Sequence, residues 1–255
     1  MPGAGDPRLL LLGGTEEARD LAQNIEAEGR WQLISSLAGS TSQPFALPGT
    51  LLVGGFGGAR RMAVFVREQL VRAVIDATHP YAVRIARNAV RASFVTGTPA
   101  IKLVRRPWLA EAGDRWHEVD TVAQASAFAS QLGRTWLVTL GQKGFGQLDP
   151  SGAGRCLVRS IEPIDRMPAN GVRIEARPPF CVASELDLMR SYEVDVVITR
   201  NSGSAQVYAK IEAARLLGIP VVMIRRPAPP RLVPTVADLA QVHAWLDQVA
   251  RGLRT

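Results

Sequence analysis

The chain has 255 residues, 47% of them hydrophobic, and a formal net charge of +7, so it is long enough for one large or two small domains. No apolar run reaches transmembrane length, no signal-peptide pattern is visible, and Cys156 and Cys181 lack metal-ligand spacing, so we expect a cytoplasmic protein with free thiols. The charge is mostly arginine spread along the chain, which suits an anionic ligand. With 6% aromatic residues and no base-stacking motif, we expect no nucleic-acid or membrane partner.

The first predicted unit is a strand, a glycine turn and a helix. Arg8–Leu12 is a continuous apolar run, typical of a strand covered on both faces. The turn 13–17 (Gly-Gly-Thr-Glu-Glu) follows at once, and helical spacing then continues up to Gly29. Glycines let a phosphate approach the backbone and a helix N-terminus attracts it, although an ordinary tight turn would leave the same pattern.

The second predicted strand, Trp31–Ile34, runs into the polar segment 35–41. In a dinucleotide-binding sheet this exit meets the adenosine ribose, where an acidic residue selects NAD. The segment has no acid, and Ser35, Ser36, Ser40 or Thr41 could donate to a 2′-phosphate, which favours NADP. A polar loop without a ligand is the alternative.

The third predicted strand, Leu51–Val53, leads into Gly54–Gly58, where four glycines surround one phenylalanine. These glycines allow close approach of a flat or phosphorylated group, unless they only form a flexible turn. A helix is expected over Arg60–Leu70.

A polar corner, residues 76–81 (Asp-Ala-Thr-His-Pro-Tyr), follows the buried strand Ala73–Ile75. Pro80 is expected at the first position of the next helix, and His79 before it in an extended conformation. Ligands of parallel sheets bind at such strand ends. That helix carries an arginine stripe, which is typical of a solvated face; Arg84 is its member closest to the corner.

The second half is expected to repeat the alternation after a strand over 99–104 and an irregular crossing from Pro107 to His117. The predicted elements are a helix over 121–132, a strand over 135–140 with the glycine-rich exit 141–146, a strand over 155–158, a helix over 180–191, a strand over 195–198 with the exit 199–204, a further helix ended by Gly218, a strand over 219–224 and a last helix over 236–253.

The alternation of strands and helices predicts an α/β fold of two Rossmann-like domains, residues 1–106 and 107–255, with mostly parallel sheets of four to six strands. In such sheets the polar strand exits lie on one rim, and two facing rims would form one interdomain cleft. The sequence has no nucleophile elbow, P-loop, metal-ligand triad or usefully spaced pair of carboxylates. We therefore expect dinucleotide chemistry and no metal site.

Three segments resemble the precorrin-6A reductase family of cobalamin biosynthesis: residues 10–18, residues 75–82, and residues 199–203 with Lys210 and 218–222. Residues 54–57 and 105–108 also match. The resemblance implies NADPH-dependent reduction of a double bond in precorrin-6A, or in its cobalt counterpart, to give precorrin-6B. It also implies two Rossmann-like domains with cofactor and substrate between them. The positive charge then fits a tetrapyrrole with many carboxylates.

The residues expected to bind the cofactor are Gly13, Gly14, Thr15, Glu16, Ser36, Gly39, Gly55, Asp76, Thr78 and His79. Those expected to bind the macrocycle are Tyr81, Arg84, Lys143, Asn201, Ser202, Gly203 and Lys210. His79, Tyr81 or Lys210 is expected to position or deliver the proton, unless solvent does so. The alternatives are another NADP-dependent reductase of a small acid and a non-catalytic dinucleotide-binding regulator. We expect a monomer or a weak homo-oligomer.

Overall fold

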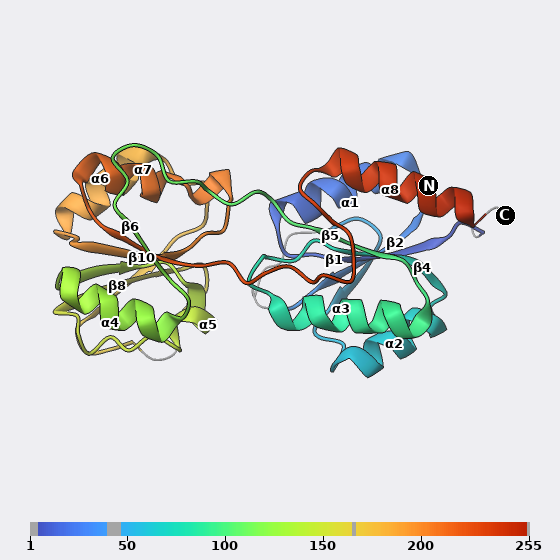
Figure 1. Cartoon of the computed structure of the whole chain (residues 1–255), viewed down its shortest axis with the longest axis horizontal. Helices are drawn as coiled ribbons and strands as arrows, with labels where there is room; N and C mark the ends of the chain where they lie inside the picture. Colours follow the sequence, from blue (N-terminus) through green and yellow to red (C-terminus); the bar gives the residue numbers. More distant parts are fainter. Residues whose placement is uncertain (1–4, 40–46, 165–166, 254–255) are drawn as a thin grey trace. The chain divides into compact units, whose positions relative to one another are not determined.

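The computed structural model describes residues 5–39, 47–164 and 167–253, and the chain forms two compact units (Figure 1). Unit 1 comprises Met1–Arg106 and Pro227–Thr255, and unit 2 comprises Pro107–Arg226. Ser40 and Thr41, two of the predicted donors to a 2′-phosphate, lie outside the described residues. None of the helices in the described ranges combines the length and the apolar character needed to cross a membrane.

Unit 1 is built on a six-stranded parallel sheet with the order β12-β5-β4-β1-β2-β3. Its strands are β1 (Arg8–Leu12), β2 (Gln32–Leu37), β3 (Thr50–Val53), β4 (Val71–Asp76), β5 (Ala100–Leu103) and β12 (Thr235–Val236). The chain leaves β1 toward β2 on one side and reaches β4 on the other, so the strand order reverses between β1 and β4. In doubly wound sheets a ligand crevice opens at this switch point.

Helices cover both faces of this sheet, as Figure 1 shows. One face carries α1 (Glu16–Glu28) and α8 (Leu239–Gly252), and the other carries α2 (Ala59–Glu68) and α3 (Val83–Thr96). Leu9 and Leu11 pack toward the first pair of helices, whereas Leu10 and Leu12 pack toward the second. Because alternate side chains of a strand enter opposite cores, the four buried positions of β1, Leu9–Leu12, are all apolar.

The predicted second domain of residues 107–255 is wrong in its last part, because the chain returns to unit 1 after Arg226. There, β12 pairs with β5, and the buried Val242 and Leu246 of α8 complete the core beside α1. The predicted helix over 236–253 also begins later, at Leu239, where the Asp238 side chain accepts a hydrogen bond from Gln241 N.

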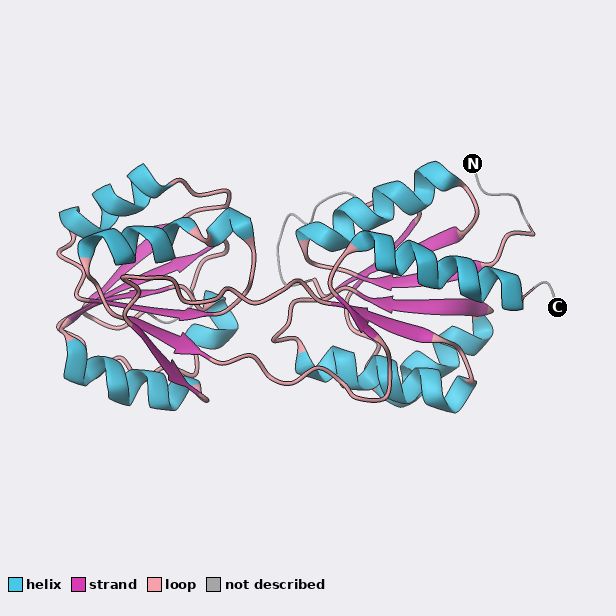
Figure 2. Cartoon of the chain, turned by 45° about the horizontal axis from the view of Figure 1, so that its top comes forward, coloured by secondary structure: helices cyan, strands magenta, loops and turns pink. Residues whose placement is uncertain are grey.

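Unit 2 has a second parallel sheet with the order β6-β11-β10-β7-β8-β9, between two helical layers (Figure 2). Its elements are β6 (Trp116–Val119), α4 (Val122–Leu132), β7 (Thr135–Val138), α5 (Gly141–Phe145), β8 (Arg155–Ser160), β9 (Gly171–Glu175), α6 (Val182–Ser191), β10 (Val196–Arg200), the 3₁₀ turn η1 (Ala205–Val207), α7 (Ala209–Leu217) and β11 (Val221–Ile224). The two parallel α/β sheets confirm the predicted fold class.

Several local details differ from the prediction. The edge strand β6 begins within the stretch predicted to be irregular, and the edge strand β9 was not predicted, although Val172 and Ile174 alternate with polar residues in it. The glycine-rich exit of β7 forms the short helix α5. Pro80 does not start α3, because it lies in a turn closed by a hydrogen bond from Ala82 N to His79 O at 2.8 Å, and the helix begins at Val83.

Candidate functional site

Two glycines form the turn between β1 and α1, of which Gly13 is buried and Gly14 is exposed. Gly13 N donates to Ser36 O at 2.9 Å, and a Cβ on Gly13 would lie 3.3 Å from Leu37 Cδ2. Gly14 has a φ of +113°, and no described atom lies within 4 Å of the position of a Cβ. A side chain is thus disfavoured at Gly13 by packing and at Gly14 by backbone conformation, and open space remains over Gly14.

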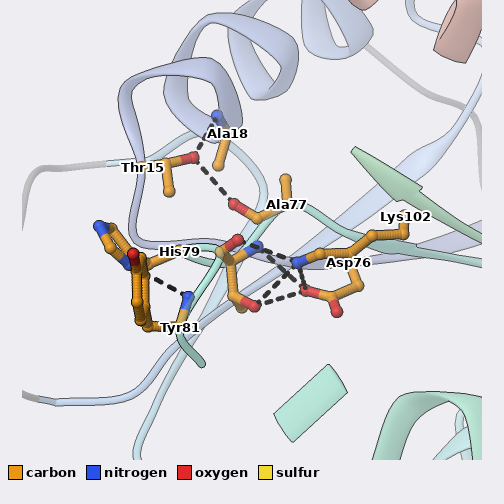
Figure 3. Close-up of polar contacts among 8 residues, drawn as sticks. Thr15, Ala18, Asp76, Ala77, His79, Tyr81 and Lys102 are labelled. Atoms are coloured by element: carbon orange, nitrogen blue, oxygen red, sulfur yellow. Dashed lines mark hydrogen bonds and ion pairs between the residues drawn. The ribbon is translucent and has the colours of Figure 1, made fainter. Parts of the chain in front are cut away.

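Thr15 connects this turn to the end of β4 across the switch point. Its Oγ1 accepts a hydrogen bond from Ala18 N at 3.2 Å, which caps α1, and donates to Ala77 O at 2.8 Å (Figure 3). The first-turn N–H groups of Glu16 and Glu17 have no acceptor inside the helix. The end of α1 therefore has the partial positive charge that attracts a phosphate.

The corner after β4 is held by a buried ion pair. Asp76 Oδ1 accepts hydrogen bonds from Thr78 N at 3.0 Å and Thr78 Oγ1 at 2.6 Å, and it lies 2.9 Å from Lys102 Nζ. Desolvation lowers the pKa of Lys102, against the raising effect of Asp76. Because Asp76 and Thr78 are buried and bonded to each other, they shape the corner from beneath and expose little of their own polar surface.

His79 and Tyr81 are the half-buried side chains of the corner, and Figure 3 shows their rings side by side, away from Lys102. Their ring centroids are 5.6 Å apart, and Tyr81 N donates to His79 Nδ1 at 3.4 Å. With Nδ1 as the acceptor, a neutral His79 ring carries its proton on Nε2. Arg84 is exposed in the first turn of α3, one turn beyond Tyr81.

The residues predicted to bind the adenosine side of the cofactor, at the ends of β2 and β3, differ in how exposed they are to solvent. Ser35 is buried and donates to Pro48 O at 3.1 Å, and Ser36 is only 6% exposed within β2. By contrast, Gly39 and Gly55 are exposed at the strand ends.

Arg61, which is not among the residues predicted from the sequence, is exposed in the first turn of α2. Its side chain folds back over the glycine turn, since a Cβ on Gly57 would lie 2.9 Å from Arg61 Cδ and 3.0 Å from Nη1. Its guanidinium therefore lies at the exit of β3, next to the exit of β2. The available signal was the pair Arg60–Arg61, which follows the glycine-rich exit of β3 after one residue.

In unit 2 the predicted substrate residues gather where the strand order reverses between β7 and β10. The hydroxyls of Thr139 and Thr199 join the two strand ends at 2.8 Å. Lys143 is exposed on α5, and Ser202 is buried after β10. The Asn201 amide pairs with the backbone of Trp108, through Trp108 N to Oδ1 at 2.8 Å and Nδ2 to Trp108 O at 2.9 Å.

Lys210 lies in a buried charged cluster at the start of α7. Its Nζ donates to Val207 O at 2.7 Å and lies 5.0 Å from the centre of the Trp108 ring. Arg159 and Glu185 form a buried ion pair near it. Desolvation, followed by repulsion from Arg159, lowers the pKa of Lys210 to about 7, although Glu185 opposes the shift. This value suits a proton donor near neutral pH.

A wide groove of about 690 Å³ lies on unit 1 between α2, α3 and Leu232. Its lining is mostly apolar and includes Phe94, and it runs along the helices. It contains none of the predicted site residues, so we do not assign the chemistry to it.

Comparison with known proteins identifies the family. The family model described as "Precorrin-6x reductase CbiJ/CobK" matches residues 8–247. A precorrin-6A reductase of Rhodococcus erythropolis is 42% identical over 96% of this chain and 99% of its own length. A cobalt-precorrin-6A reductase of Priestia megaterium is 28% identical over 96% of this chain and 97% of its own.

A solved structure described as "CobK precorrin-6A reductase" has the same fold, with a TM-score of 0.86 and 36% identity, over 95% of this chain and 97% of that one. The family model, the sequence relatives and the solved structure each match this chain over nearly its whole length, and all three point to the same family. The resemblance found in the three sequence segments is therefore confirmed. The chain belongs to the precorrin-6x reductase family.

Proposed function

We propose that this protein transfers a hydride from NADPH to a double bond of the precorrin-6A macrocycle and so forms precorrin-6B. The observation that carries the proposal is the family match over residues 8–247, together with a glycine turn and a polar corner joined at the switch point of a Rossmann sheet. Membership of this family makes the chain a reductase, which implies a nicotinamide cofactor. It favours this role over a dinucleotide-binding regulator or a reductase of small acids.

The cobalt-free macrocycle is the better-supported substrate. The Rhodococcus relative, named a precorrin-6A reductase, is 42% identical to this chain, whereas the cobalt-precorrin-6A reductase of Priestia is 28% identical. We propose a cytoplasmic enzyme that is a monomer or a weak homo-oligomer.

Unit 1 has the features that a dinucleotide needs. The open space over Gly14, the capped N-terminus of α1 and the Thr15 bridge fit a pyrophosphate, with Gly13 permitting the tight turn. Glu17 would repel a phosphate, but Arg105 Nη1 lies 2.9 Å from its Oε1 and offsets its charge. When bound, NADPH supplies the hydride.

The preference for NADPH over NADH is proposed to come from Arg61, which would bind the 2′-phosphate. Ser36 is the residue that the sequence suggested for this role. A guanidinium forms strong charge-assisted hydrogen bonds with phosphate, and Arg61 is exposed beside the exits of β2 and β3. The Ser36 hydroxyl is less accessible because it lies within the strand.

The proton for the reduced macrocycle has three candidate donors in this chain. A neutral His79 offers its Nε2 proton as a hydrogen-bond donor, and Tyr81 has a phenol next to it. Lys210 has a pKa of about 7 and exchanges protons readily near neutrality. Arg84, Lys143, Asn201, Ser202 and Gly203 are proposed to bind the macrocycle, the two cations through its carboxylates.

The test mixes the purified protein with precorrin-6A and with either NADPH or NADH, and follows both the nicotinamide and the tetrapyrrole absorbance. We expect NADPH to be oxidised in step with macrocycle reduction, and absence of oxidation would overturn the proposal. Arg61→Ala should raise the KM for NADPH about tenfold and leave that for NADH unchanged, since one charge-assisted contact is lost. Ser36→Ala is the matched variant. If it alone changes the preference, the Arg61 assignment is wrong.

A further inference from the structure

Unit 1 buries one lysine and one aspartate in its sheet, and they face each other. Among the residues that the structure describes in this unit, Asp76 and Lys102 are the charged residues classed as buried, with 5% and 4% exposure. They are register partners on β4 and β5, and both side chains point to the face covered by α3. The pair therefore lies directly beneath the polar corner.

Lys102 uses all three of its N–H donors at this corner. Its Nζ lies 2.9 Å from Asp76 Oδ1, 2.9 Å from Thr78 O and 3.3 Å from Thr78 Oγ1 (Figure 3). Asp76 Oδ1 in turn accepts from Thr78 N. Both backbone groups of Thr78 are thus held, its N–H by the carboxylate and its C=O by the ammonium.

Stability alone does not explain a charged pair at this position. Replacement of a buried ion pair by apolar residues of similar volume is often neutral or stabilising, because both charges must be desolvated. A pair of aliphatic side chains would fill the space between β4, β5 and α3, but would leave Thr78 O without its donor. The distinctive effect of Lys102 is to fix the peptide that joins Thr78 to His79.

We propose that Lys102 is a positioning residue, which sets the orientation of His79 and Tyr81 from the neighbouring strand through Thr78 O and Asp76. The other side of the corner is held by Thr15, whose Oγ1 donates to Ala77 O. The backbone before His79 is therefore held by two hydrogen bonds, one from Lys102 of β5 to Thr78 O and one from Thr15 to Ala77 O. The catalytic consequence rests on the proposed function, whereas the structural claim does not.

The double variant Asp76→Asn/Lys102→Met tests the proposal. It removes both buried charges together, keeps an acceptor oxygen for Thr78 N, and releases Thr78 O. We expect kcat with NADPH and precorrin-6A to fall roughly 100-fold, because small displacements of an oriented group are costly. Ile101→Val is the matched control on β5, a buried residue packed on the opposite face of the sheet.

A second measurement does not depend on turnover. The chain has three histidines, so the ring signals of His79, His117 and His243 can be assigned by substitution and followed by NMR. We expect the double variant to shift the His79 signal and to leave the other two in place. An unshifted His79 signal, or a kcat within about twofold of the parent, would overturn the proposal, as would equal losses in the Ile101 control. If the parent protein fails to oxidise NADPH, the proposed function fails, and the NMR result still decides the role of Lys102.

Discussion

Replacement of Lys210 by methionine should make the protein more stable at neutral pH, by an amount that shrinks as the pH rises. Lys210 is only 3% exposed, and its Nζ has one hydrogen bond, to Val207 O. Arg159 repels its charge and Glu185 attracts it. Methionine has a similar length and no charge, so the variant removes the cost of desolvating the ammonium and little of the packing.

The magnitude follows from the pKa of Lys210, which burial lowers from 10.5 to about 7. Between these two values the unfolded chain holds a proton that the folded chain has released, so the free energy of unfolding of the parent rises with pH. The limiting slope is about 1.4 kcal/mol per pH unit. Because Lys210 is half protonated near pH 7, the rise from about pH 7 to about pH 9 amounts to about 2 kcal/mol.

The assay is urea unfolding of the parent and of Lys210→Met at several pH values, compared as a difference so that other titrating groups cancel. The stability advantage of the variant should be nearly constant below about pH 6 and should fall by about 3 kcal/mol from there to about pH 9. A difference that stays within about 0.5 kcal/mol over this range, or that grows with pH, would refute the reasoning.

Three further predictions concern single side chains. Thr15→Val removes the α1 cap and the bond to Ala77 O, so unfolding should become easier by about 2 kcal/mol, whereas Thr15→Ser should lose much less; thermal unfolding distinguishes them. Gly14→Ala should cost about 1–2 kcal/mol through its positive φ alone, since its Cβ would meet no described atom, and a loss below about 0.5 kcal/mol would contradict this. A thiol reagent at mildly alkaline pH should label Cys181 rapidly, because its hydrogen bonds with Ser184 lower its pKa, and should spare Cys156, whose pKa burial raises to about 11; rapid labelling of Cys181→Ser would contradict this.

The local parts of the site could be predicted from neighbouring residues. The run Arg8–Leu12, its glycine turn and the Thr15 cap follow from apolar pattern and capping chemistry, which depend on a few adjacent positions. The polar corner after β4 was recognised in the same way. The ion pair inside the corner could not be predicted, because Lys102 lies on another strand and no local pattern shows that it faces Asp76.

Residues distant in sequence explain most of the remaining differences. Ser36 was a reasonable donor to a 2′-phosphate until pairing with strands distant in sequence placed it inside the sheet. The position of Arg61 depends instead on a local contact, because its side chain folds over Gly57. Lys210 was expected to contact the macrocycle or deliver the proton, but its sequence position did not show that burial and repulsion from Arg159 lower its pKa to about 7.

The alternation of strands and helices, the two parallel sheets and the family could be predicted from the residues alone, because periodicity, turn residues and motifs are local properties of the chain. The order of the strands within each sheet depends on long-range pairing and became visible only in the fold. The chain returns after Arg226 to add β12 and α8 to unit 1, since β5 had an unpaired edge and the core beside α1 still had space for Val242 and Leu246. The same non-local pairing brought Lys102 beneath the corner, and the conformation of His79 and Tyr81 depends on it.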